Sequence, residues 1–353
     1  AKTLKRLPVD QPLRQAMSGH GYRSASAAAG PVSVTMSLRQ NALGEQRIDL
    51  TEMQLSEEDH VRAREMALLA VSRITPDTAV ALGISQTGRT LQQQLAETSE
   101  NAFLVARDPM SRAGFHPRPF ASIGVRHSFG PVALSVTSER GKAVTTFERA
   151  HDTPGYTINS VTLDARQGAA RFSLGASHLS EDETVLGSRF SPLLATGGAR
   201  TTFVDAAAAV RLGRGWALHG SYRRGWTWAR GSGGLVDNGH LASQAFAFDV
   251  SKQGLFAIDD TLAFRLMQPL RVTSGGFRLS APVSYDYESR TALYGDRLLS
   301  LAPGGRELDF EFAYGLGLFG GRFDFNGFVR TEPGNVRSAK RDVGAAIRFT
   351  LSE

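Results

Sequence analysis

The sequence predicts an all-β fold whose antiparallel strands form a transmembrane barrel. Three observations predict it: many segments alternate apolar and polar residues, tight glycine turns alternate with long polar connections, and the polar face is small and charged. The clearest alternation covers residues 307–318, where every even position is large and apolar and every odd position is acidic or small. Period two over that length is typical of a β-strand with two different faces.

Similar alternation recurs along the last two thirds of the chain. Residues 342–351 alternate in the same way, as do residues 215–229, which contain all three tryptophans. Further runs lie at 120–128, 131–139, 156–165, 169–179, 201–212, 240–251, 259–271, 277–288, 292–301 and 320–330. Some connections, such as 166–168, are tight and contain glycine, which suits hairpin corners, whereas others, such as 180–200, are long and polar. This alternation of short and long connections is typical of a meander of hairpins.

The composition of the polar face distinguishes a membrane barrel from a soluble barrel or sandwich. A soluble β domain shows its polar face to water, whereas a transmembrane barrel turns apolar residues to lipid and polar residues to the lumen. Here the polar face is rich in Gly, Ala and Ser and carries charges of both signs, which favours a crowded lumen. Aromatic residues near strand ends resemble interfacial girdles. They are Tyr222, Trp226, Trp228, Phe319 and Phe328.

Charged residues of the polar face are predicted to point into the lumen. They are Arg126, Arg171, Arg223, Arg265, Arg322, Arg348, Asp309 and Glu311. Each charge is costly in a low-dielectric wall unless it is paired, so we expect opposite charges to meet, with Arg348 bound to Asp309 or Glu311. Such a ladder either holds the wall together or lines a polar conduit. The opposite face is expected to meet lipid through Leu308, Phe310, Phe312, Leu316, Ile347 and Phe349.

The predicted organisation has three parts. Residues 1–29 are interpreted as a linker, residues 30–106 as β-hairpins plus a helix, and residues 107–353 as the barrel. Between 12 and 16 strands are expected, since about 250 residues suffice for twelve. Twelve strands counted from residue 120 would place the tight turns outside the cell and the long loops in the periplasm, the reverse of the usual arrangement. This indicates at least one further strand before residue 107. The region 30–106 is therefore either a plug or a source of extra strands.

A short helix is predicted in the N-terminal region, at residues 88–106. Its polar residues Gln92, Gln93 and Glu97 make it unsuited to lipid, so it lies either in a polar lumen, facing wall arginines, or on an ordinary surface. Asn101 lies in this segment and is a candidate processing site.

Composition excludes several function classes. The 353-residue chain has no cysteine, which rules out disulfides, thiolate metal sites and a cysteine nucleophile. Its net charge of +6 is not concentrated in a basic run, so nucleic acid is not an expected partner. The eight histidines are scattered, and His178 and His219 face opposite sides of their strands. We therefore expect no enzyme activity and no metal or other cofactor.

The C-terminal third resembles a known family. The segments are 268–276 (QPLRVTSGG), 299–307 (LSLAPGGRE), 329–334 (VRTEPG) and 342–346 (DVGAA). Together they resemble the C-terminal β domain of subtilisin-like serine peptidases of Gram-negative bacteria, which is similar to the translocator barrel of autotransporters. The likeness is clear over about residues 250–350 and loose over 78–140.

This resemblance implies a type V secretion translocator in the outer membrane of a Gram-negative bacterium. Its implied partners are the lipid bilayer, the barrel-assembly machinery and a covalently linked passenger peptidase. The subtilisin motifs are missing, so any peptidase domain is expected upstream of Ala1. The chain also ends without the terminal aromatic residue usual in such barrels, and Phe349 is the nearest one. The alternatives are an outer-membrane porin and a soluble β domain that assists folding of an attached peptidase.

Overall fold

The structure is a computed structural model of the chain. It describes residues 21–30, 32–40, 46–47, 66–98, 103, 105–106, 108–111, 113–144, 154–190, 196–231, 236–318 and 321–351. Within these residues the chain forms seventeen strands, one α-helix and two short 3-10 helices. The all-β prediction with one short helix is therefore confirmed.

The strands follow one another along the chain, and among the described residues a single α-helix interrupts them. They are β1 (Gly21–Ala29), β2 (Val32–Gln40), β3 (Gln46–Arg47), β4 (Met66–Arg73), β5 (Thr78–Ile84), β6 (His116–Phe129), β7 (Val132–Val144), β8 (Gly155–Gln167), β9 (Ala170–Glu181), β10 (Thr196–Gly213), β11 (Trp216–Gly231), β12 (Val236–Gln253), β13 (Thr261–Asp286), β14 (Thr291–Ser300), β15 (Leu308–Leu318), β16 (Gly321–Thr331) and β17 (Asp342–Leu351). The helices are α3 (Gly88–Leu95), η3 (Pro109–Ser111) and η5 (Pro333–Asn335).

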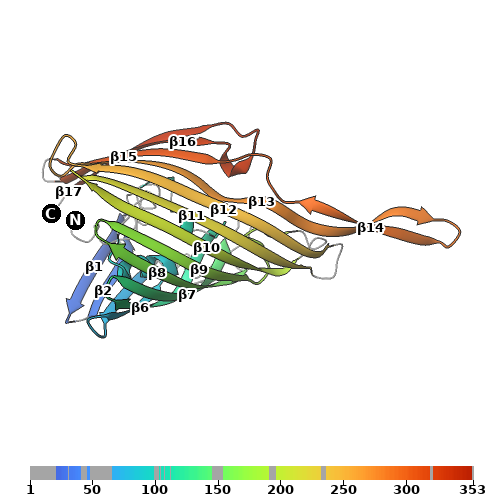
Figure 1. Cartoon of the computed structure of the whole chain (residues 1–353), viewed down its shortest axis with the longest axis horizontal. Helices are drawn as coiled ribbons and strands as arrows, with labels where there is room; N and C mark the ends of the chain where they lie inside the picture. Colours follow the sequence, from blue (N-terminus) through green and yellow to red (C-terminus); the bar gives the residue numbers. More distant parts are fainter. Residues whose placement is uncertain are drawn as a thin grey trace.

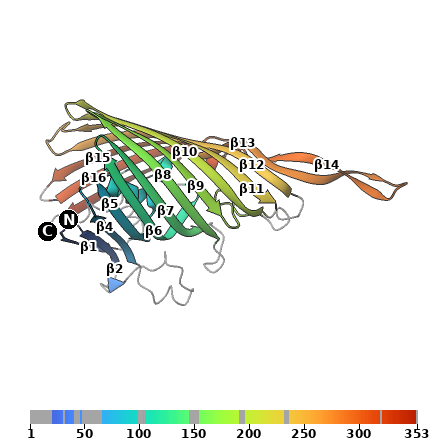
Figure 2. The ribbon, with the colours of Figure 1, turned by 60° about the horizontal axis from the view of Figure 1, so that its bottom comes forward.

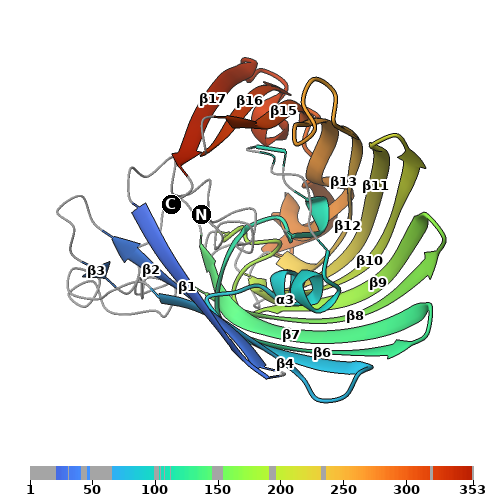
Figure 3. The same ribbon diagram turned by 90° about the vertical axis from the view of Figure 1, so that its left-hand side faces the viewer.

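One antiparallel sheet contains all seventeen strands and curves around a lumen that holds α3 (Figure 3). Nearly every strand pairs with the next one along the chain. The exceptions are β3 and β14, which are side branches, since β2 also pairs with β4 and β13 also pairs with β15. Without them, the described wall has fifteen strands, within the predicted range of 12 to 16.

The longest strand, β13, leaves the wall at one end. Its first part, from Thr261 to Met267, pairs with β15, and its last part, from Gly276 to Asp286, pairs with β14. The resulting β13–β14 hairpin projects well beyond the other strands (Figures 1 and 2).

Short and long connections gather at opposite ends of the wall. The tight connections follow β1, β4, β6, β8, β10, β12 and β15, and we call their side the turn end. Gly130 and Gly168 form two of these turns with φ of 67° and 57°, a left-handed conformation that favours glycine. The other connections, including the β13–β14 hairpin, lie at the loop end.

The wall has an apolar exterior and a polar interior. On β15, Phe310 is 46% exposed, whereas Asp309 and Glu311 are each only 2% exposed and lie on the inner face. On β17, Ile347 and Phe349 are exposed on the outer face, and Arg348 lies on the face of Asp324. These orientations agree with the predicted two-faced strands. Among the described residues, no helix is long and apolar enough to cross a bilayer.

One aromatic prediction, that for Phe328, differs from the structure, and another is not tested. Phe328 is the register partner of Glu311 and of Gly344, so it shares the lumen face rather than the lipid face. The alternation of β16, in which Asp324 and Asn326 point inward, places Phe328 inward as well. Phe319 lies outside the described residues.

The N-terminal region contributes to the wall. The predicted linker, residues 1–29, is a strand at Gly21–Ala29, because β1 pairs with β2 along its whole length. The linker prediction is therefore wrong for those residues. From the range 30–106, the strands β2, β4 and β5 also join the wall.

Candidate functional site: a segment held across the lumen

The connection between β5 and β6, residues 85–115, turns into the lumen, where it starts with α3. We call it the inward connection. The helix begins after Thr87, whose hydroxyl accepts a hydrogen bond from the Thr90 amide at 3.1 Å. This is ordinary N-capping by a threonine. The helix ends at Leu95, because Glu97 adopts a left-handed φ of 51° and Thr98 donates from its amide to the Gln93 carbonyl at 3.0 Å. The predicted helix at 88–106 was therefore right at its start and too long at its end.

Small residues in the wall make room for this helix. Leu91 and Leu95 are buried against Leu69 and Ala81 on the inner face of β4 and β5. A Cβ atom on Gly83 would lie 2.8 Å from Cβ of Gln86 and 2.9 Å from a methyl group of Leu91, so a larger residue would force these side chains to shift. The absence of a side chain at this position thus lets the apolar face of α3 approach the strands.

Wall carboxylates bind the backbone of the inward connection. Glu139 on β7 accepts from the Gly88 amide at 2.6 Å. Glu311 on β15 accepts from the amides of Val105 at 2.7 Å and Ala106 at 2.9 Å. Since β7 and β15 stand on opposite sides of the lumen (Figure 3), the connection is attached to both.

An arginine on β13 completes the second attachment. Arg265 donates to the Ala106 carbonyl at 3.0 Å, and its guanidinium lies 4.3 Å from the centre of the Phe103 ring. The same side chain binds Asp249 on β12 through a paired contact that includes an Nε–Oδ1 bond of 2.5 Å. Arg265 therefore joins two wall strands to the inward connection, and Phe103 is only 1% exposed beneath it.

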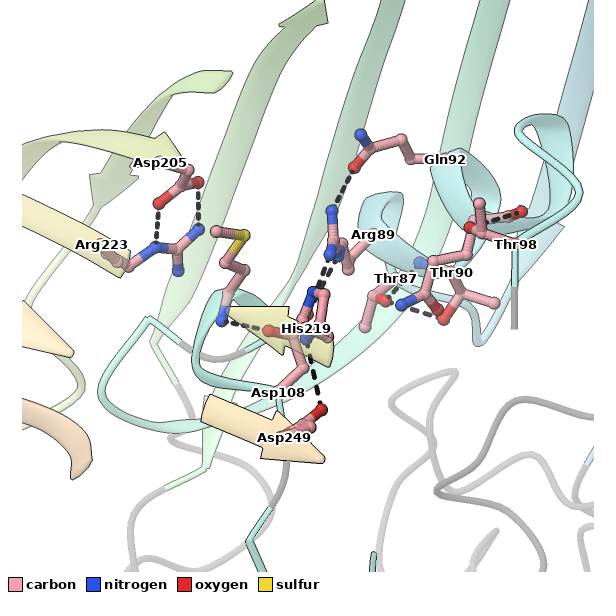
Figure 4. Close-up of polar contacts among 12 residues, drawn as sticks. Thr87, Arg89, Thr90, Gln92, Thr98, Asp108, Asp205, His219, Arg223 and Asp249 are labelled. Carbon is pink, nitrogen blue, oxygen red and sulfur yellow. Dashed lines mark hydrogen bonds and ion pairs between the residues drawn. The ribbon is translucent and has the colours of Figure 1, made fainter. Parts of the chain in front are cut away.

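A buried ion pair ties the two ends of the connection to each other (Figure 4). Arg89 on α3 binds the Asp108 carboxylate at 3.0 Å, and Asp108 also accepts from the Met110 amide at 3.0 Å. Burial raises the pKa of Asp108, but Arg89 and the Met110 amide lower it more, so its pKa lies below the usual value. Asp108 is therefore an anion at neutral pH.

Most predicted lumen arginines bind carboxylates of the same wall. Arg223 forms two bonds to Asp205, of 2.7 and 2.8 Å. Arg126 binds Asp164 and donates to the Ser135 hydroxyl at 2.8 Å. The contact between Arg223 and Asp205 is a planar two-point contact, which is the strongest geometry that an arginine makes with a carboxylate.

The expected partner of Arg348 was wrong. Arg348 binds Asp324 at 2.8 Å, and Arg322 binds the other oxygen of the same carboxylate at 2.8 Å. In register, Arg348 is the direct partner of Asp324 on β16, whereas Asp309 and Glu311 belong to β15, one strand further away. Strand order therefore excludes the predicted pair.

Arg330, which was not among the predicted lumen residues, binds acidic groups at the start of β15 and of β17. It binds Glu307 at 2.5 Å and lies 3.5 Å from Asp309 and 3.4 Å from Asp342. Its even position on β16, in phase with Asp324, was the sequence signal that could have identified it.

A cavity of about 130 Å³ lies between α3 and the inner face of the strands from β6 to β11. Gln92 and Gln93 line it together with Arg126 and Arg171, so two of the predicted helix residues do face predicted arginines across one cavity. Glu97 also faces a wall arginine, but outside this cavity: it forms an ion pair with Arg73, which ends β4 at the turn end. Asn101 lies outside the described residues.

The described lumen is lined by polar and charged side chains. His219 lies inside, 3.2 Å from Asp249, and His178 lies outside, 3.5 Å from the Thr202 hydroxyl, so the two cannot act together. The described residues include no group of three or more His, Asp or Glu suited to a metal ion. The inward connection lies among charged side chains of the surrounding strands.

No protein-family model matches the sequence, and no curated protein matches it. Solved structures with a similar backbone include OprB of Pseudomonas putida at high pH, with 11% identity over 91% of this chain and 82% of that chain, and a TM-score of 0.45. A porin structure gives 10% identity over 93% of this chain and 91% of that chain, with a TM-score of 0.44. At this similarity no residue role and no activity is transferred from either protein.

Proposed function

We propose that the chain is an outer-membrane β-barrel channel of a Gram-negative bacterium, with a lumen narrowed by the β5–β6 connection. One observation carries this proposal: large apolar side chains are exposed on the outside of the wall, and charged side chains are buried inside it. Phe264 and Phe310 are 51% and 46% exposed, whereas Arg265 and Glu311 are 4% and 2% exposed. Such an inside-out distribution suits lipid outside and water inside.

The lumen chemistry suits small hydrophilic solutes. Charges of both signs line it, and α3 and its wall contacts occupy part of the cross-section. Paired charges give a polar surface without a strong net field, so we expect a passive conduit with size exclusion as its main selectivity.

The experiment is conductance of the reconstituted barrel in planar bilayers. Replacing residues 86–98, which include α3, by a Gly-Ser linker should raise single-channel conductance several-fold, because the α-helix of the described lumen is removed. The matched control deletes residues 284–293 at the tip of the β13–β14 hairpin, outside the lumen, and should leave conductance unchanged. Equal conductance of wild type and the α3 deletion would contradict the narrowed-channel proposal.

The translocator role implied by the resemblance stays a prediction. The inward connection lies between two wall strands in sequence, so it is not the linker to a passenger that a translocator would hold there. A soluble β domain predicts no folded, heat-modifiable band in cold detergent, whereas a membrane barrel of either kind predicts one.

A further inference from the structure

Three arginines lie on the outer surface of the wall, toward the loop end. Arg224 on β11 lies two residues from each of the exposed Tyr222 and Trp226 and so shares their face, which points away from the lumen. Its register partner on β12 is Gln244, whose own partner on β13 is Arg271. Neighbours in register share a face, which places Arg271 outside as well.

The third arginine, Arg306, precedes β15. Its guanidinium lies 5.9 Å from the ring centre of Phe246, and its Nε donates to Gln268 at 2.6 Å. Gln268 donates in turn to the Gln244 carbonyl at 3.4 Å. Arg224, Arg271 and Arg306 therefore belong to one continuous set of contacts, which we call the outer arginine patch.

This patch differs from the lumen in its charge balance. Arg271 donates to the carbonyls of Pro303 at 2.8 Å and Gly305 at 2.9 Å. Arg224 lies 3.4 Å from both the Gln244 amide oxygen and the Thr273 hydroxyl.

Within the described part of the chain, no carboxylate forms an ion pair with any of the three guanidinium groups. Glu332 accepts from the backbone amide of Arg306 at 2.6 Å, not from its guanidinium. In contrast, lumen arginines such as Arg223, Arg265 and Arg330 each bind an aspartate or glutamate.

We propose that the outer arginine patch binds the phosphate groups of an anionic lipid in the leaflet at the loop end. This rests on the proposed function, since it requires the barrel to lie in a bilayer. Trp226 and Trp228 are exposed beside the patch, and such residues mark the level of lipid headgroups. Three cations without carboxylate partners at that level complement a phosphorylated headgroup, while the exposed Phe248 lies deeper, where acyl chains would pack.

The test is a lipid titration by native mass spectrometry, with lipid A as the probe. The R224Q/R271Q/R306Q variant should bind lipid A about 100-fold more weakly than wild type, at about one tenfold step or less per arginine. The matched control R166Q/R211Q/R214Q removes three exposed arginines near the turn end and should bind like wild type. The single variants R224Q and R306Q, each expected to be several-fold weaker, keep the test valid if the triple variant does not fold.

Insertion into phosphatidylcholine vesicles and the heat-modifiable band are measured first. A wild-type chain that does not insert would overturn the proposed function and this inference with it. Insertion with equal lipid A binding by all variants would overturn only the lipid site. If free inorganic phosphate displaced bound lipid A as effectively as the same concentration of competing lipid A, the patch would be a site for a soluble anion. That outcome would contradict a lipid ligand.

Discussion

The carboxylate of Glu311 on β15 accepts a hydrogen bond from the backbone amide of Ala106 at 2.9 Å. The two residues are 205 positions apart in sequence, so the wall near the C-terminal end of the barrel holds a segment that starts near its N-terminal end. Glu311 also accepts from the Asn326 side chain at 2.9 Å, which keeps its carboxylate oriented toward the lumen. The position of the inward connection therefore depends on strands from the C-terminal part of the sequence.

Glu311→Ala should loosen the inward connection. The change leaves two backbone amides without their anionic acceptor, at a cost of about 2–4 kcal/mol in the free energy of unfolding. Single-channel recordings should show larger current fluctuations, and the unfolding midpoint in urea should fall. Glu288→Ala, at an exposed position on the β13–β14 hairpin, is the control and should change neither.

Phe312→Arg should destabilise the barrel in lipid. Phe312 lies on the outer face, where the centre of its ring is 5.1 Å from the ring centre of Phe264. An arginine near mid-membrane costs about 2–4 kcal/mol in the free energy of unfolding. Urea titration in vesicles measures the change. Phe256→Arg is the control, because Phe256 is 82% exposed in the turn between β12 and β13 and should cost below about 0.5 kcal/mol. Equal costs at both positions would contradict a lipid-facing β15.

A double-mutant cycle should find coupling between Arg348 and Asp324. The pair is partly exposed, so we expect about 1 kcal/mol of coupling energy. Asp324→Asn alone should cost more than Arg348→Gln alone, because the aspartate also binds Arg322. The same cycle between Arg348 and Asp309 should give no coupling, and a coupling there would mean that the register of β16 is different.

The turn between β12 and β13 should make the barrel acid-sensitive. Burial raises the pKa of Asp260, but backbone amides of Phe256, Leu255 and Ala257 lower it more, to about 2. A pKa below the unfolded value of 3.8 stabilises the fold above that pH, and the contribution is lost as pH falls toward 2. Asp260→Asn should therefore be less stable than wild type at neutral pH and lose less stability between pH 4 and pH 2. Unfolding by urea at both pH values tests this, and parallel losses would contradict it.

The strands and their faces could be predicted from sequence because period two depends only on neighbouring residues. The side on which Glu311 and Arg348 lie follows from that period. The partner of Arg348 does not, since it depends on which strand lies next to β17 and on the register set by the connection of residues 332–341. Phe328 was misplaced because its position near a strand end was given more weight than its phase with Asp324.

The inward connection was predicted only in part. Its polarity and its helix start at residue 88 are local features, and the sequence shows both. Its attachment is not local, because Glu139 and Glu311 come from strands on opposite sides of the lumen. Gly83 was equally uninformative, since a glycine that seats a helix looks in sequence like any other small residue of the inner face.

The fifteen-strand count of the described wall has a consequence for its two edges. Adjacent wall strands alternate in direction, so the first and last of an odd series, β1 and β17, run the same way. If these edges met directly, they would form a parallel pair with slanted, slightly weaker hydrogen bonds, unlike every other junction of the wall. An antiparallel closure would instead require one additional strand. In a closed barrel, the seam between β1 and β17 would thus be the place where the bonding pattern changes or another strand enters.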